Sequence, residues 1–168
     1  YTVFNVEQTE GIEVPPGPPK KVVNSIEEAV SVYDRMPNGP SLEHHGDRAF
    51  YKPSSDLVVM PPRNRFKGAE EYYSTLFHEL THSTGHQNRL SRPGLVEAIV
   101  FGSDRYSKEE LVAEMGATFL CGHVGIVERT LDNSAAYINN WLGRLNKDRK
   151  LVVQAGGQAQ KAVDYILG

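Results

Sequence analysis

The sequence predicts an α+β domain, because its strand-like segments come first and its strongest amphipathic segments follow. Its 168 residues suit one domain, which buries roughly two-thirds of its unfolded surface. Hydrophobic residues make up 39% and charged residues 23%, as is typical of globular proteins. We therefore expect residues 1–168 to form a single domain in which a small antiparallel or mixed sheet packs on about four to five helices.

Strand signals are confined to the first part of the chain. Residues 2–8 (TVFNVEQ) alternate between apolar and polar side chains and predict a strand, and a proline-rich connector follows at 13–21. Residues 49–53 and 56–61 flank the turn signal SSD. These two segments predict a β-hairpin.

Five segments show the apolar spacing of helices. They cover residues 25–36, 69–85, 108–121, 135–146 and 148–166. Ser25 with Glu28, and Ser107 with Glu110, have the spacing of capping boxes that open two of these helices. Gly85 is the stop signal of the second predicted helix. We expect a loop over 87–106 with a short helical turn inside it.

Three histidines and one glutamate are concentrated in HELTHSTGH, residues 78–86. His78 and His82 are four residues apart, and on a helix this spacing places their Cβ atoms roughly 5–6 Å apart on one face. Both imidazoles can therefore bind one zinc ion. Glu79 follows the first histidine, where its carboxylate can hold a water molecule and act as a general base. This HExxH arrangement predicts metal-dependent hydrolysis.

A zinc site with two histidines lacks a third protein ligand. His86 is one candidate, as a ligand or as a support for the site; the metzincin spacing does not apply, because it would place a histidine at Asn88. The other candidates are Glu110 and Glu114 in EELVAE, which share a helix face. One of these carboxylates can bind the metal while the other binds a ligand histidine. The spacing alone leaves the choice open.

Charge and cysteine content exclude several classes of protein. A formal net charge of -3 gives no overall basic field for nucleic acid. The single cysteine, Cys121, excludes an internal disulfide and argues against a cysteine-rich structural zinc site. The apolar runs are too short to predict a membrane helix. Basic stretches at 63–67 and 144–150 favour one alternative, a DNA-associated or protein-binding module with little turnover.

HELTH followed by ELVAE resembles the gluzincin arrangement of zinc peptidases. More specifically, the chain resembles the C-terminal metallopeptidase domain of ArdC-type antirestriction proteins, a domain also found in plasmid primases and phage polyvalent proteins. The blocks that carry this resemblance are FNVEQTEG, YYSTLFHELTHSTGH, YSKEELVAEMGATFLCGHVGI, AAYINNWL and QAQKAVDYIL. They occur in the family's order and cover nearly the whole chain.

The resemblance implies a zincin fold and a zinc-dependent endopeptidase whose peptide substrate it does not name. The implied metal ligands are His78, His82 and Glu110. Glu79 is the implied general base, and Glu114 is the implied carboxylate behind a ligand histidine. The resemblance also implies a bacterial cytoplasmic protein of mobile elements. Because such proteins carry a single-stranded-DNA-binding domain before the FNVEQ block, we expect this chain to be a piece of a longer protein.

A peptidase also needs a group that stabilises the oxyanion of the transition state. Tyr106, His123 and Tyr137 are candidates by residue type alone. We further expect the strand DLVVMP, residues 56–61, to form a sheet edge on which an extended peptide substrate pairs, as zincin architecture suggests.

Overall fold

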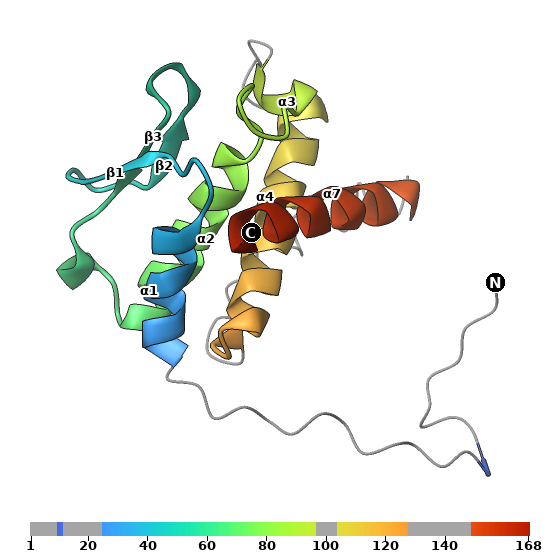
Figure 1. Cartoon of the computed structure of the whole chain (residues 1–168), viewed down its shortest axis with the longest axis horizontal. Coiled ribbons are helices and arrows are strands. Elements are labelled where there is room, and N and C mark those ends of the chain that lie inside the picture. Colours follow the sequence, from blue (N-terminus) through green and yellow to red (C-terminus); the bar gives the residue numbers. More distant parts are fainter. Residues whose placement is uncertain (1–9, 12–24, 97–103, 128–148) are drawn as a thin grey trace.

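The structure is a computed structural model that describes residues 10–11, 25–96, 104–127 and 149–168. The predicted strand at 2–8, the connector at 13–21 and the predicted helix at 135–146 lie outside these residues. Within them a small sheet packs on a group of helices, which confirms the predicted α+β class. Figure 1 shows the sheet on one side of the green helix α2, and α4 on its other side.

The helices of the described residues are α1 (Ser25–Arg35), α2 (Ala69–Ser83), the short α3 (Pro93–Val96), α4 (Asp104–His123) and α7 (Arg149–Leu167). The bounds of α1, α2 and α7 agree with the predicted helices to within two residues. None of the described helices is long and apolar enough to cross a membrane.

The start of α4 differs from the prediction. The helix begins at Asp104, so Ser107 lies inside it and the predicted capping box of Ser107 with Glu110 is wrong. Glu110 lies well inside α4, where a helix-end role no longer accounts for its charge.

The end of α4 also lies further along the chain than predicted, because the helix continues through Gly122 to His123. The chain then turns away at Gly125, whose φ of 78° lies in the left-handed region. The amide of Ile126 donates to the carbonyl of Cys121 at 2.9 Å, as in a Schellman motif. The sequence predicts that the helix ends before Gly122, but the left-handed Gly125 is the glycine that terminates it.

The sheet has three strands in the order β1–β3–β2. They are β1 (Ser41–His44), β2 (Phe50–Lys52) and β3 (Leu57–Met60). β2 and β3 form the predicted hairpin, joined by a 3-10 turn at Pro53–Ser55. β1 pairs with β3 in parallel, so the sheet is mixed. The sequence did not predict β1, because this four-residue strand is largely exposed and has no apolar alternation.

β3 is the central strand and pairs on both sides, so the predicted peptide-binding edge at 56–61 is wrong. Val58 and Met60 are fully buried. A short continuous apolar run of this kind is typical of a strand buried on both faces. The exposed edges of the described sheet are β1 and β2.

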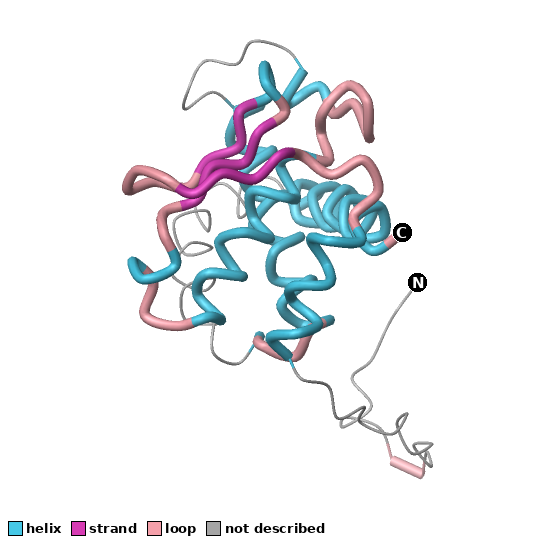
Figure 2. The backbone as a smooth tube through the Cα atoms, turned by 60° about the vertical axis from the view of Figure 1, so that its left-hand side comes forward, coloured by secondary structure: helices cyan, strands magenta, loops and turns pink. Residues whose placement is uncertain are grey.

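α2 lies at the centre of the packing, because it contacts both the sheet and the helices α1, α4 and α7. Figure 2 shows the three strands side by side against the helices. Its apolar side chains form one core with residues of the sheet, α1, α4 and α7. That core includes Val58, Met60, Tyr72, Leu76, Phe77, Leu80, Leu120 and Ile166. A second cluster of Leu111, Val112, Leu151, Ala155 and Ala159 fixes α4 on α7. Together these cores hold α2 and α4, which carry the predicted site residues, side by side.

Candidate metal centre

His78 and His82 lie on the face of α2 that meets α4. Their Nε2 atoms are 3.1 Å apart, and their rings meet at 79° with centroids 4.8 Å apart. The helical spacing of four residues therefore brings both nitrogens to one point, as the sequence predicts.

Glu110 reaches the same point from α4. Its Oε1 lies 3.4 Å from Nε2 of His82, and its Oε2 lies 3.7 Å from Nε2 of His78. The potential ligand atoms of the three residues all lie within 4.8 Å of one another. Ligands held at about 2.1 Å around a tetrahedral ion are about 3.4 Å apart, so this set has the dimensions and the donor types of a zinc-like site.

A further carboxylate lies behind each histidine. Oε2 of Glu114 is 3.3 Å from Nδ1 of His78. Oε1 of Glu109 is 3.4 Å from Nδ1 of His82. A carboxylate at Nδ1 fixes the tautomer and the ring orientation that leave Nε2 free to bind a metal.

Sequence reasoning missed Glu109 and its partner Arg92. Glu109 is a neighbour of Glu110 in KEEL, and only the rotation of α4 against α2 reveals that it faces His82. Arg92 lies between α2 and α3 in the predicted loop, where no periodicity marks it, and its Nη2 lies 2.6 Å from Oε1 of Glu109.

Glu79 is buried beside the histidines, with 7% of its surface exposed. Its negative charge contributes to raising the pKa values of both His78 and His82. A carboxylate in this place can accept a proton close to the convergent Nε2 atoms.

The surrounding carboxylates change the pKa values of the histidines. Burial lowers the pKa of His78, but hydrogen bonds to Glu110 and Glu114 outweigh it and raise the pKa to about 10. Burial also lowers the pKa of His82, and hydrogen bonds to Glu109 and Glu110 outweigh it, so that this pKa too is raised. The centre therefore favours positive charge, as a cation site must.

Comparison with known proteins places this geometry in a family. The sequence profile described as Zincin-like metallopeptidase matches residues 36–158, which include all the residues of the centre. The chain belongs to the zincin-like metallopeptidase family.

Relatives of this zincin-like domain are larger proteins. An Escherichia coli protein named DNA primase TraC is 40% identical over 169 residues, covering 99% of the chain and 11% of TraC. The uncharacterized protein y4eC of Sinorhizobium fredii is 32% identical over 166 residues, covering 99% of the chain and 52% of y4eC. The chain thus spans about half or less of these relatives.

Crystal structures of the antirestriction protein ArdC from plasmid R388 have the same fold, which confirms the resemblance to ArdC-type proteins. The Mn(II)-bound structure is 34% identical with a TM-score of 0.70, and the match covers 99% of this chain and 60% of ArdC. The metal-free structure gives a TM-score of 0.66 at the same identity and covers 58% of ArdC.

Two other predicted site residues, His86 and His123, do not join the centre of the zincin-like domain. His86 is half-buried after α2 and accepts a hydrogen bond from the amide of Asn88 at 3.3 Å. His123 is exposed at the end of α4, thirteen residues and about 20 Å along the helix from Glu110, too far to stabilise a reaction there. Tyr137 and the side chain of Tyr106 lie outside the described part of the chain.

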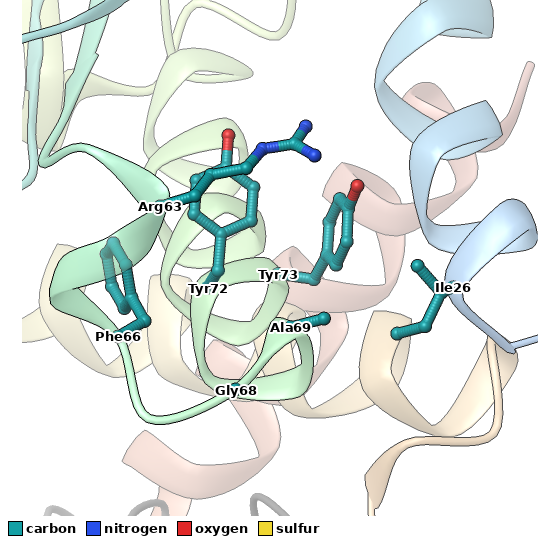
Figure 3. A pocket seen from close by; sticks show the side chains of 7 residues that line it. All are labelled: Ile26, Arg63, Phe66, Gly68, Ala69, Tyr72 and Tyr73. Atoms are coloured by element: carbon teal, nitrogen blue, oxygen red, sulfur yellow. The ribbon is translucent and has the colours of Figure 1, made fainter.

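A separate cavity lies at the N-terminal end of α2 (Figure 3). It is lined by Ile26, Arg63, Phe66, Gly68, Ala69, Tyr72 and Tyr73. The guanidinium carbon of Arg63 lies 4.8 Å from the ring centroid of Tyr72 and 5.8 Å from that of Tyr73. One arginine of the basic stretch 63–67 is thus stacked on aromatic rings of the domain.

Proposed function

We propose that this zincin-like domain is a metal-dependent peptidase and that its metal is zinc. The observation that carries the proposal is the convergence of two imidazole nitrogens and the Glu110 carboxylate, with Glu79 buried beside them. The Mn(II)-bound structure of ArdC supports a divalent cation in this fold. Two imidazoles with one carboxylate are the ligand set of many catalytic zinc sites.

His78, His82 and Glu110 would hold the ion. When bound, zinc supplies Lewis-acid chemistry, which polarises carbonyl oxygens and acidifies water. Glu79 accepts a proton from the attacking water and returns it to the leaving amine. Glu114 keeps Nδ1 of His78 engaged and so maintains the orientation of its ring.

Metal analysis and one substitution test this function. Purified protein is expected to contain about one zinc ion per chain, because the three ligands form one site. Glu79→Gln is expected to keep the metal and to lower cleavage of a random library of quenched fluorescent peptides by at least about a hundredfold, because it removes the general base. Glu27→Gln makes the same change at an exposed position of α1 and serves as the control.

The proposal fails if the purified protein does not bind a divalent ion. It also fails as a hydrolytic mechanism if metal-loaded Glu79→Gln cleaves peptides as fast as the wild type does.

The alternative function is a DNA-associated module with little turnover. The names of TraC and ArdC, a DNA primase and an antirestriction protein, favour this link to DNA. Fluorescence anisotropy with single-stranded oligonucleotides at two salt concentrations tests it. Binding that weakens at the higher salt concentration, without peptide cleavage, would favour the alternative.

A further inference from the structure

The segment after α2 folds back on the metal centre and places Arg92 against it. This side chain is only 7% exposed. Its guanidinium donates to the carbonyl oxygens of Thr81 at 2.7 Å and His82 at 3.4 Å, and to the hydroxyl of Thr84. Arg92 therefore binds backbone carbonyls of the last turn of α2, in addition to the hydroxyl of Thr84 on Thr81 and the amide of Gly85 on His82.

The same guanidinium holds Glu109 with two donors. Nη2 of Arg92 lies 2.6 Å from Oε1 of Glu109, and Nε lies 3.0 Å from Oε2. A two-point contact of this kind fixes the plane of a carboxylate as well as its position. Only 5% of the Glu109 side chain is exposed, so water contributes little to its orientation.

Glu109 in turn contacts a proposed metal ligand, because its Oε1 lies 3.4 Å from Nδ1 of His82. When Nδ1 donates its proton to this carboxylate, the lone pair of the ring is on Nε2. That nitrogen faces Glu110 and His78. The ring of His82 is thus oriented by a carboxylate that is itself fixed by an arginine.

Gly85 leaves the space that the guanidinium occupies. A Cβ at this position would lie 3.1 Å from Nη2 of Arg92 and 3.1 Å from Cβ of Leu95. The φ angle of Gly85 is not in the left-handed region, so the backbone does not require glycine here. The guanidinium of Arg92 and the Cβ of Leu95 together leave little room for a side chain here.

We propose that Arg92 and Glu109 form a positioning pair that orients His82 for metal binding. Gly85 supports this pair, because the absence of a side chain there leaves room for Arg92. This inference rests on the metal centre proposed above. Neither side chain binds the ion, and both act through His82. The charge of Arg92 offsets that of Glu109, so this carboxylate orients a ligand without adding net negative charge to the centre.

Zinc affinity tests the pair. The full chain is stripped of metal and titrated with Zn²⁺ in competition with a chromophoric chelator. Glu109→Gln and Arg92→Gln are each expected to raise the Kd about 10- to 100-fold. The double variant is expected to lose no more zinc affinity than whichever single variant binds zinc more weakly, because the two residues act as a unit. Arg92→Lys keeps the charge but not the two-point contact. Its zinc affinity is therefore expected to lie between that of Arg92→Gln and that of the wild type.

Gly85→Ala probes the pair without changing either of its members. We expect a smaller rise in the Kd, because the guanidinium must move by a few tenths of an ångström to admit the Cβ. The part of this rise that comes from Arg92 is expected to disappear in the Arg92→Gln background, whereas any part that comes from Leu95 remains. The visible absorption of bound Co²⁺, which reports ligand geometry, is expected to change in Glu109→Gln and in Arg92→Gln.

Asp56→Asn is the matched control. It removes a carboxylate from another arginine of the same segment, Arg89, without touching a proposed ligand. We expect it to lower the stability of the fold and to leave both the Kd and the Co²⁺ spectrum unchanged.

The outcomes separate the pair from the metal centre. A wild-type chain that does not bind zinc overturns the metal centre itself. If the wild type binds zinc, and the Kd values of folded Glu109→Gln and Arg92→Gln stay within about twofold of the wild-type value, the positioning pair is wrong and the centre stands. If Arg92→Gln does not fold, Arg92→Lys and Gly85→Ala decide the question by the same criterion.

Discussion

Gly116 of α4 lies directly against Thr81 of α2 where the two helices pack. A Cβ at position 116 would lie 2.5 Å from Cγ2 and 2.7 Å from Oγ1 of Thr81. Thr81 is fully buried, and its hydroxyl donates to the carbonyl of Phe77 at 2.7 Å. The missing side chain at Gly116 therefore permits the close approach of α2 and α4 that brings Glu110 to the histidines.

Gly116→Ala is expected to push the two helices apart. The added methyl group has no space beside Thr81, so we expect a loss of about 1–3 kcal/mol in the free energy of unfolding. Zinc is also expected to bind more weakly, because Glu110 moves with α4. Denaturant unfolding and chelator competition measure the two effects.

Gly122→Ala is the control on the same helix, since a Cβ there meets nothing within 4 Å. It is expected to leave zinc binding unchanged and to stabilise the helix by up to about 1 kcal/mol. If the two alanine variants behave alike, the close contact does not determine the geometry of the centre.

Glu110→Gln and Glu114→Gln distinguish a metal ligand from a supporting group. Glu110 faces both Nε2 atoms, whereas Glu114 contacts only Nδ1 of His78. We expect Glu110→Gln to purify without stoichiometric zinc, and Glu114→Gln to retain zinc with about 10- to 100-fold weaker affinity. If Glu114→Gln purifies without zinc and Glu110→Gln retains it, Glu114 is the metal ligand and Glu110 is the supporting group.

The pKa of His78 in the metal-free protein can be measured by NMR. It is raised to about 10 by the neighbouring carboxylates, although burial opposes the shift. His78 is therefore expected to stay protonated at pH 8, and Glu114→Gln is expected to lower its pKa. A ring that titrates near the ordinary histidine value of about 6.5 would contradict this prediction.

The same shift affects stability, because the folded state binds this proton more tightly than the unfolded chain does. The contribution of His78 to the free energy of unfolding is complete below the ordinary value of 6.5 and is lost as the pH rises through about 10. Denaturant unfolding of the metal-free protein at pH 6.5 and pH 9.5 is expected to show lower stability at the higher pH.

Asp56→Asn is expected to destabilise the fold without affecting the metal. Asp56 binds the buried guanidinium of Arg89 and accepts a hydrogen bond from the hydroxyl of Tyr51 at 2.7 Å. Asparagine tolerates the left-handed φ of 47° at this position, so the lost charge is the main change. We expect a loss of about 1–3 kcal/mol in the free energy of unfolding. Asp47→Asn, at an exposed position, is expected to have no measurable effect.

Local patterns were sufficient to predict most of the described elements. The spacing of apolar residues predicted α1, α2, α7 and the β2–β3 hairpin. The spacing of His78 and His82 predicted that their imidazoles share one face of α2, since this follows from helix geometry alone. β1 was missed because its pairing with β3 depends on a distant partner and not on its own sequence.

The sequence by itself determined which residue types are available for a metal centre and which helices carry them. Only the tertiary structure decided that β3 is central, that Glu110 faces both Nε2 atoms, and that Glu109 and Arg92 lie behind His82. These relationships depend on the rotation and separation of α2 and α4. The packing of Gly116 on Thr81, together with the two cores, fixes the rotation and the separation of these helices. Such contacts join residues that are distant in the chain, so they leave no periodic signal in the sequence.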